Sequence, residues 1–168
     1  EYERTSIVRV MEIEEKIGRS NINIGRDNIW RLESDIDDLS GERLGFLMDA
    51  LFKAGALDVH YASIHMKKNR PAVELCVICH EEKRLALEEL IFMETTTIGI
   101  RRVKMERSIL KREIKVQDTP LGSVDVKEVI LPDGSRRRYP EYDSVVDLAK
   151  SNNMHFYEAW EEITGYIR

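Results

Sequence analysis

Apolar and polar residues recur along the chain with two different periods, and the changes of period mark the predicted elements. Residues 28–37 (NIWRLESDID) alternate in part, as in a strand with one buried face. The following segment has helical periodicity, with an apolar face formed by Leu44, Leu47, Met48, Leu51 and Phe52. Ser40 is suited to cap the start of this helix and Gly55 to end it. The pattern predicts a strand followed by an amphipathic helix.

The next segments predict two strands and a second helix. Residues 57–65 and 71–80 alternate like strands, and the charged stretch HMKKNRP joins them. Residues 81–93 (EEKRLALEELIFM) then return to helical spacing, and the β-prone run 98–116 follows. This order of elements predicts an α+β fold, a ferredoxin-like split βαβ sandwich.

The last third of the chain predicts an added β-ribbon and C-terminal helices. Residues 122–140 contain the turn signal PDGS between two β-prone runs. Residues 140–150 and 154–168 have helical spacing. Residues 1–26 are mostly polar and predict a linker or an edge extension, so we expect one domain over residues 27–168.

Composition narrows the functional classes. The chain has 168 residues and a formal net charge of -5, which argues against a protein that coats nucleic acid. No apolar run approaches the roughly 20 residues of a membrane-spanning helix, and no leader sequence opens the chain. Cys76 and Cys79 would face opposite sides of a strand, which favours two buried thiols over a zinc or redox pair. We expect a soluble cytoplasmic protein that binds neither nucleic acid nor membrane.

Acidic residues gather between the first predicted strand and its helix. Asp35, Asp37 and Asp38 lie there, and carboxylates in such a loop can hold a hard divalent cation. The alternative is that they only cap the helix. Both interpretations are open on the sequence alone.

Two basic or hydroxyl-rich segments are candidates for phosphate binding. Lys67, Lys68 and Arg70 stand in the turn between two strands, where the alternative is a solvated hairpin tip. A second segment, ETTTIGIRR (residues 94–102), offers hydroxyls and two arginines, although a threonine run also has plain β-propensity. The chain has no P-loop pattern, so a phosphate site would depend on these segments meeting in the fold.

Several motifs together resemble one known family. DIDDLSGERLG, GALDVHYASIHMKKNRPAVEL, IFMETTTIGIRR and PEYDSVVDLAK follow in the order and spacing of the C-terminal domain of LarC. LarC is the nickel-insertion protein that completes the nickel-pincer nucleotide cofactor of lactate racemase. The resemblance covers roughly residues 28–168. The chain departs from the family pattern at Asp35, at Leu39 and Ser40, and at Tyr139.

The resemblance implies an enzyme, a nickel chelatase of which this chain is the CTP-binding C-terminal half. CTP would be consumed with release of CMP and pyrophosphate, Mn or Mg would accompany the nucleotide, and nickel would be a substrate ion. The partners implied are a pyridinium mononucleotide substrate, further copies in a trimer or hexamer, and a separate N-terminal LarC domain.

The resemblance also implies roles for the candidate residues. Lys67, Lys68 and Arg70 would be catalytic and neutralise the triphosphate. The residues that would bind the nucleotide are Thr95, Thr96, Thr97, Arg101 and Arg102. Asp35, Asp37 and Glu94 would bind the metal ion. The competing hypothesis is a non-catalytic ferredoxin-like module that regulates or oligomerises and binds a small anionic ligand.

Overall fold

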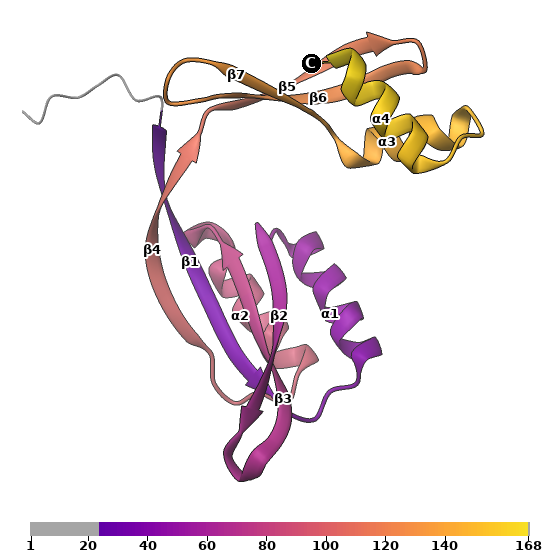
Figure 1. Cartoon of the computed structure of the whole chain (residues 1–168). Coiled ribbons are helices and arrows are strands. Elements are labelled where there is room, and N and C mark those ends of the chain that lie inside the picture. Colours follow the sequence, from indigo (N-terminus) through magenta and orange to yellow (C-terminus); the bar gives the residue numbers. More distant parts are fainter. Residues whose placement is uncertain (1–23, 168) are drawn as a thin grey trace, which may run out of the picture. The chain divides into compact units, whose positions relative to one another are not determined.

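The structure, a computed structural model, describes residues 24–167 and divides into two compact units. One unit is Ile24–Ile109, and the other contains Leu110–Arg168. Helices and antiparallel strands occur in both units, so the predicted mixed α+β class is confirmed (Figure 1). The linker or edge extension predicted over residues 1–26 lies outside the described residues except for its last three, which begin the first strand.

The unit Ile24–Ile109 has helices and strands in the predicted order. Its elements are β1 (Ile24–Ile36), α1 (Gly41–Ala54), β2 (Asp58–Met66), η1 (Lys67–Asn69), β3 (Arg70–Cys79), α2 (Glu81–Glu94) and β4 (Arg101–Leu110). The strands form one sheet in the order β2-β3-β1-β4, and β3 is antiparallel to both β1 and β2. The central strand β1 therefore lies between β3 and β4.

Both helices cover the same face of this sheet. Leu32 and Ile36 of β1 are buried in one core with Leu47 of α1 and Leu87 of α2. Because side chains alternate along a strand, Glu33 and Asp35, which come directly after Leu32 and directly before Ile36, lie on the opposite face. That face carries no helix of this unit (Figure 1).

The caps of α1 follow the sequence signals. The Ser40 side chain accepts a hydrogen bond from the backbone N–H of Arg43 at 3.4 Å. Gly55 ends the helix with φ of 103°, a left-handed conformation that glycine adopts without steric cost. Both predicted helix signals are confirmed.

The second unit has its own sheet and core. Its elements are β5 (Arg112–Thr119), β6 (Gly122–Ile130), β7 (Arg136–Pro140), α3 (Tyr142–Ser151) and α4 (Phe156–Ile167). The strand order is β5-β6-β7, and the predicted PDGS turn joins β6 to β7. Buried residues of β6, α3 and α4 form the core: Val124, Val126, Val145, Ala149, Ala159, Ile163 and Ile167.

A buried carboxylate ties the three strands of the second unit together. Glu128 of β6 is 3% exposed, and its oxygens accept from Lys115 Nζ at 2.6 Å, Arg136 Nη1 at 2.6 Å and Arg138 Nε at 3.0 Å. Hydrogen bonds from Lys115 and Arg138 lower the pKa of Glu128 to about 2. Glu128 is therefore charged at neutral pH, and cations from β5 and β7 satisfy it.

Two further sequence expectations concern helices and thiols. No helix within residues 24–167 is long and apolar enough to cross a membrane. Cys76 and Cys79 are free and buried, as the strand pattern predicted.

Two glycines of the α1 region provide a matched stability test. Gly55→Ala should lower the free energy of unfolding by about 1–2 kcal/mol, because alanine is strained at positive φ. Gly45→Ala should raise it by up to about 1 kcal/mol, because Gly45 lies within the helix, where a Cβ meets nothing within 4 Å. Urea unfolding of both variants measures the difference. Equal effects of the two substitutions would contradict the assigned caps.

The Glu128 network predicts a pH dependence of stability. The pKa of Glu128 in the folded chain is about 2, below the ordinary 4.5, so its contribution is present above 4.5 and is lost as pH falls toward 2. Glu128→Gln should therefore destabilise the protein most near neutral pH and least in acid. Thermal unfolding across this pH range tests it, with Glu162→Gln, at an exposed position of α4, as control. A deficit independent of pH would refute the assignment.

Candidate functional site

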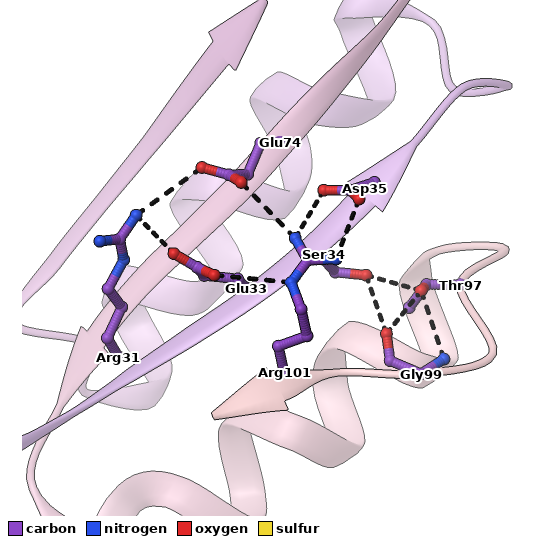
Figure 2. Close-up of polar contacts among 8 residues, drawn as sticks. All are labelled: Arg31, Glu33, Ser34, Asp35, Glu74, Thr97, Gly99 and Arg101. Carbon is purple, nitrogen blue, oxygen red and sulfur yellow. Dashed lines mark hydrogen bonds and ion pairs between the residues drawn. The ribbon is translucent and has the colours of Figure 1, made fainter. Parts of the chain in front are cut away.

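The open face of β1 carries a network of charged side chains. Arg31, Glu33 and Asp35 occupy alternate positions of β1, opposite in direction to the buried Leu32 and Ile36. Figure 2 shows how these side chains converge with residues of β3 and β4. The same two-residue period that builds the core thus builds the charged face.

Arg101 of β4 is the centre of this network. Its guanidinium donates to both oxygens of Asp35, at 2.9 and 2.7 Å, and lies 3.5 Å from Glu33 and 3.5 Å from Glu74 (Figure 2). The two-fold hydrogen bond lowers the pKa of Asp35 and raises the pKa of Arg101. Arg31 contacts Glu33 and lies 3.7 Å from Glu74. More carboxylates than guanidiniums meet here, so the face is acidic overall.

The threonine segment is fixed against the buried side of β1. Ser34 is 1% exposed, and its Oγ donates to Thr97 Oγ1 at 2.6 Å. Thr97 Oγ1 donates in turn to the backbone oxygen of Gly99 at 3.0 Å. Thr95 Oγ1 donates to the Ile91 oxygen in the last turn of α2, at 2.7 Å. These bonds place the α2–β4 loop beside the end of β1.

The loop after β1 contacts both of the other predicted segments. Asp37 forms an ion pair with Arg70 of the β2–β3 hairpin at 2.7 Å. The next residue, Asp38, accepts a hydrogen bond from Thr96 Oγ1. Acidic, basic and hydroxyl-bearing segments that are far apart in the sequence therefore meet at one end of this unit.

The hairpin tip presents two lysines to solvent. Lys68 and Asn69 have positive φ angles of 63° and 57°, which is uncommon for a lysine. Lys67 and Lys68 are exposed and form no ion pair with any residue between 24 and 167. Their charges are not neutralised by a near neighbour in the described structure.

A shallow groove lies beside the hairpin. Its volume is about 340 Å³, and its lining includes Asp37 from the loop after β1 and Ser63, His65 and Pro71 from β2 and β3. The rest of its lining is apolar (Ile36, Leu39, Ile64, Ala72 and Val73), so the polar groups of this hollow are Asp37, Ser63 and His65. Ligand pockets of folded proteins commonly start at about 300 Å³.

Some predicted site residues are not brought into this cluster. Arg102 lies on the helix-covered face and contacts Glu88 of α2 at 3.3 Å, because neighbouring strand residues face opposite ways. The backbone oxygen of Glu94 accepts from Arg43 at 3.2 Å. Within residues 24–167, no three His, Cys, Asp or Glu side chains are grouped so that they could hold a metal ion. The carboxylates Asp35 and Asp37 are instead paired with arginines.

Sequence reasoning missed several members of the cluster. Arg31 and Glu33 share the face of Asp35, and the two-residue period of RLESD could have identified them. Glu74 joins them through the β1–β3 register, in which it lies opposite Asp35. The apolar pattern does not choose between registers that differ by two residues, so Glu74 required the structure.

Comparison with protein families assigns the chain. The model of the nickel insertion protein family matches residues 1–160. The chain belongs to this family. The resemblance to LarC that its motifs indicated is therefore confirmed.

Named relatives come from several bacteria. The pyridinium-3,5-bisthiocarboxylic acid mononucleotide nickel insertion protein of Alkaliphilus metalliredigens is 44% identical over 134 residues, which are 80% of this chain and 32% of that protein. The protein of the same name from Geobacillus kaustophilus is 36% identical over 90% of this chain and 37% of its own length. The chain thus spans about a third of the curated relatives that it matches.

A solved structure matches most of the chain. LarC2, the C-terminal domain of a cyclometallase involved in the synthesis of the NPN cofactor of lactate racemase, was determined in its apo form. It is 36% identical to this chain and has a TM-score of 0.77. The match covers 83% of this chain and 96% of the LarC2 chain. The protein MK0293 of Methanopyrus kandleri, with 19% identity and a TM-score of 0.62, shares the fold.

The Arg101 network predicts a pH-dependent coupling. Arg101→Ala should lower the free energy of unfolding by about 1 kcal/mol at neutral pH, since the pair is partly exposed and three carboxylates would remain together. The pKa of Asp35 is lowered in the folded chain, so the contribution is present above the ordinary 3.8 and is lost as pH falls through the lowered value.

A double-mutant cycle with Asp35→Asn measures that coupling by urea unfolding at two pH values. We expect a coupling energy near neutral pH and a smaller one in acid. Additive effects of the two substitutions at neutral pH would show that the pair contributes nothing to stability.

Proposed function

We propose that this chain is the nucleotide-binding C-terminal part of a nickel insertase. The proposed enzyme uses CTP to place nickel in the pyridinium-3,5-bisthiocarboxylic acid mononucleotide, with release of CMP and pyrophosphate. Family membership and the names of the relatives support the reaction. Nickel is the substrate ion of this reaction, and the completed cofactor would serve lactate racemase.

One observation carries the nucleotide site in this proposal. The loop after β1 contacts the basic hairpin through Asp37 and the threonine segment through Asp38. A triphosphate needs cations and hydroxyl or amide donors from more than one direction, because its charge is spread over several oxygens. These segments supply such donors around one end of the sheet.

The proposed roles combine the family resemblance with these contacts. Lys67, Lys68 and Arg70 would neutralise the triphosphate, and Thr95–Thr97 with Arg101 would position it. Arg102 would join them only after leaving Glu88. Electrostatic stabilisation of this kind is the main work of a protein in phosphoryl and nucleotidyl transfer.

A divalent Mn or Mg would be held jointly with the nucleotide. Such ions are commonly bound by one or two carboxylates together with phosphate oxygens, so a complete protein cage is not required. Asp35 and Asp37 are the proposed carboxylates, with Glu94 as a further candidate near the threonine segment. The bound ion would offset phosphate charge.

Ion pairs between proposed phosphate-binding arginines and proposed metal-binding carboxylates are present in the structure without ligand. They lead to a specific expectation about how nucleotide and metal bind. Arg101 and Arg70 are held by Asp35 and Asp37, so two of the proposed phosphate-binding groups are each paired with a proposed metal-binding carboxylate. Nucleotide alone would leave two carboxylates unpaired beside its phosphates. With nucleotide and metal together, the arginines would turn from the carboxylates to the phosphates, and the carboxylates would turn from the arginines to the metal ion. We therefore expect the binding of nucleotide and metal to be cooperative.

The wider assembly is also part of the proposal. A ferredoxin-like split βαβ arrangement agrees with the strand order β2-β3-β1-β4 and the two helices on one face. Because the chain spans about a third of its relatives, a separate N-terminal domain would complete the enzyme. The resemblance to LarC further implies a trimeric or hexameric assembly. Free buried cysteines suit a cytoplasmic location.

Calorimetric titration with CTP and manganese tests the nucleotide site. Lys67→Ala and Arg70→Ala should each weaken CTP binding by about 10-fold or more, the worth of a charge-assisted contact. Lys53→Ala is the matched control, because it removes one positive charge at the end of α1 and should leave binding unchanged. Unfolding midpoints should separate lost binding from lost folding.

Omission of manganese completes this test. CTP without manganese, and manganese without CTP, should each bind at least about 10-fold more weakly than the pair. Absence of CTP binding at millimolar concentration, or equal binding by wild type and both variants, would remove the proposal.

A further inference from the structure

The sheet of the second unit has one face that α3 and α4 do not cover. Val126 of β6 belongs to the core beneath these helices, and side chains alternate along a strand, so Lys127 points the other way. The strand register places Ile114 of β5 and Tyr139 of β7 on either side of Lys127. We call this surface the open face; besides Lys127, the residues that matter on it are Arg112, Ile114, Val116, Asp125, Arg137 and Tyr139.

The open face is more apolar than a solvated sheet face usually is. An antiparallel sheet with one face in water normally carries polar residues on that face. Ile114 is instead 63% exposed and Val116 is 70% exposed, and both lie on β5 at the edge of the sheet. Tyr139 of β7 adds an aromatic ring that is 45% exposed. Exposed apolar side chains that gather on one surface indicate a contact with another molecule.

Positive charge accompanies these apolar side chains. The register places Arg112 and Arg137 in one row across the sheet, and both are exposed. Neither forms an ion pair with another residue between 24 and 167. Asp125 offsets one of the two charges, and Lys127 is paired with Glu141 at 2.8 Å. The open face therefore keeps a net positive charge.

The solvent side of α4 has the opposite charge. This helix buries Ala159 and Ile163 in the core, which leaves Tyr157 and Glu161 on its outer side, one helical turn apart. Tyr157 is 71% exposed, and Glu161 is exposed as well. The residues Phe156–Ile167 include three glutamates and no lysine or arginine. We call this outer side the α4 face; it combines an aromatic ring with negative charge.

We propose that the α4 face of one copy of this chain docks on the open face of a second copy. The contact covers the apolar side chains of the sheet and sets a negative surface against a positive one. A helix is also the usual cover for a sheet face that carries apolar residues. The inference rests on the proposed function for the existence of an assembly, and it names the two surfaces that form it.

The two surfaces differ, so the contact is head-to-tail. Each copy binds one neighbour through its α4 face and another through its open face. Contacts of this kind form a ring when the rotation between copies closes, which suits the proposed trimer or hexamer. Two open faces packed against each other would instead bring arginines close to arginines, and like charges in a contact are unfavourable.

Light scattering of the whole chain during gel filtration, over a range of concentrations, tests this inference. The wild type should be an oligomer. Ile114→Asp places a carboxylate on the open face, and Tyr157→Asp removes the ring from the α4 face, so each variant alone should be a monomer. Both side chains are largely exposed, so circular dichroism should show that both variants are folded.

A mixture of the two variants separates head-to-tail docking from other contacts. The Ile114→Asp chain keeps an intact α4 face, and the Tyr157→Asp chain keeps an intact open face. Mixed in equal amounts, they should form a dimer with one copy of each and no larger species, because each chain has only one working surface. A contact between two like surfaces would not give this dimer.

Charge reversal tests the electrostatic part. Arg137→Glu should weaken association by about 10-fold or more, because it sets a carboxylate against the glutamates of α4. Lys53→Glu is the matched control, because it makes the same change of charge at an exposed position of α1 in the other unit, and it should assemble like wild type.

The outcomes separate this inference from the proposed function. A wild-type chain that stays monomeric overturns it, as would result if residues 1–23 of the same chain covered the open face. Normal assembly of either single variant, or a mixture that gives no dimer, also overturns it, even if CTP binds with manganese. An oligomer that depends on Ile114 and Tyr157 but binds no CTP sustains the docking inference while the nucleotide proposal fails.

Discussion

The two-residue period of strand β1 is the constraint on which the unit Ile24–Ile109 depends. One set of its side chains, including Leu32 and Ile36, enters the core beneath α1 and α2. The other set, including Glu33 and Asp35, meets Arg101 on the face without helices. A shift of register by one residue would bury carboxylates and expose the core, so packing energy fixes the position of the charged network.

Ion pairs between arginines and aspartates are the main feature of the candidate site. The guanidiniums that could bind phosphate and the carboxylates that could bind a cation neutralise one another through Arg101–Asp35 and Arg70–Asp37. Such partly exposed pairs are weak, on the order of 1 kcal/mol or less, so a highly charged ligand can displace them. In the absence of ligand, these two arginines and two aspartates therefore remain close together and paired with one another.

Much of the fold could be predicted from the sequence, because local signals determine local structure. Periodicity located the helices, Ser40 and Gly55 marked the ends of α1, and PDGS located the β6–β7 turn. Side-chain partners across strands were less accessible. The contact of Glu74 with Arg101 depends on the β1–β3 register, and the direction of Arg102 toward Glu88 depends on where β4 begins. The sequence pattern determines neither the β1–β3 register nor the first residue of β4.

Hydrogen–deuterium exchange of the chain with CTP and manganese tests most directly whether the separated segments form one nucleotide site. Our account predicts that the ligands slow exchange together in the loop after β1, the hairpin Lys67–Asn69 and the threonine segment Thr95–Thr97, while Lys67→Ala diminishes all three effects. Protection confined to the second unit, or absent from the three segments despite measurable binding, would contradict it.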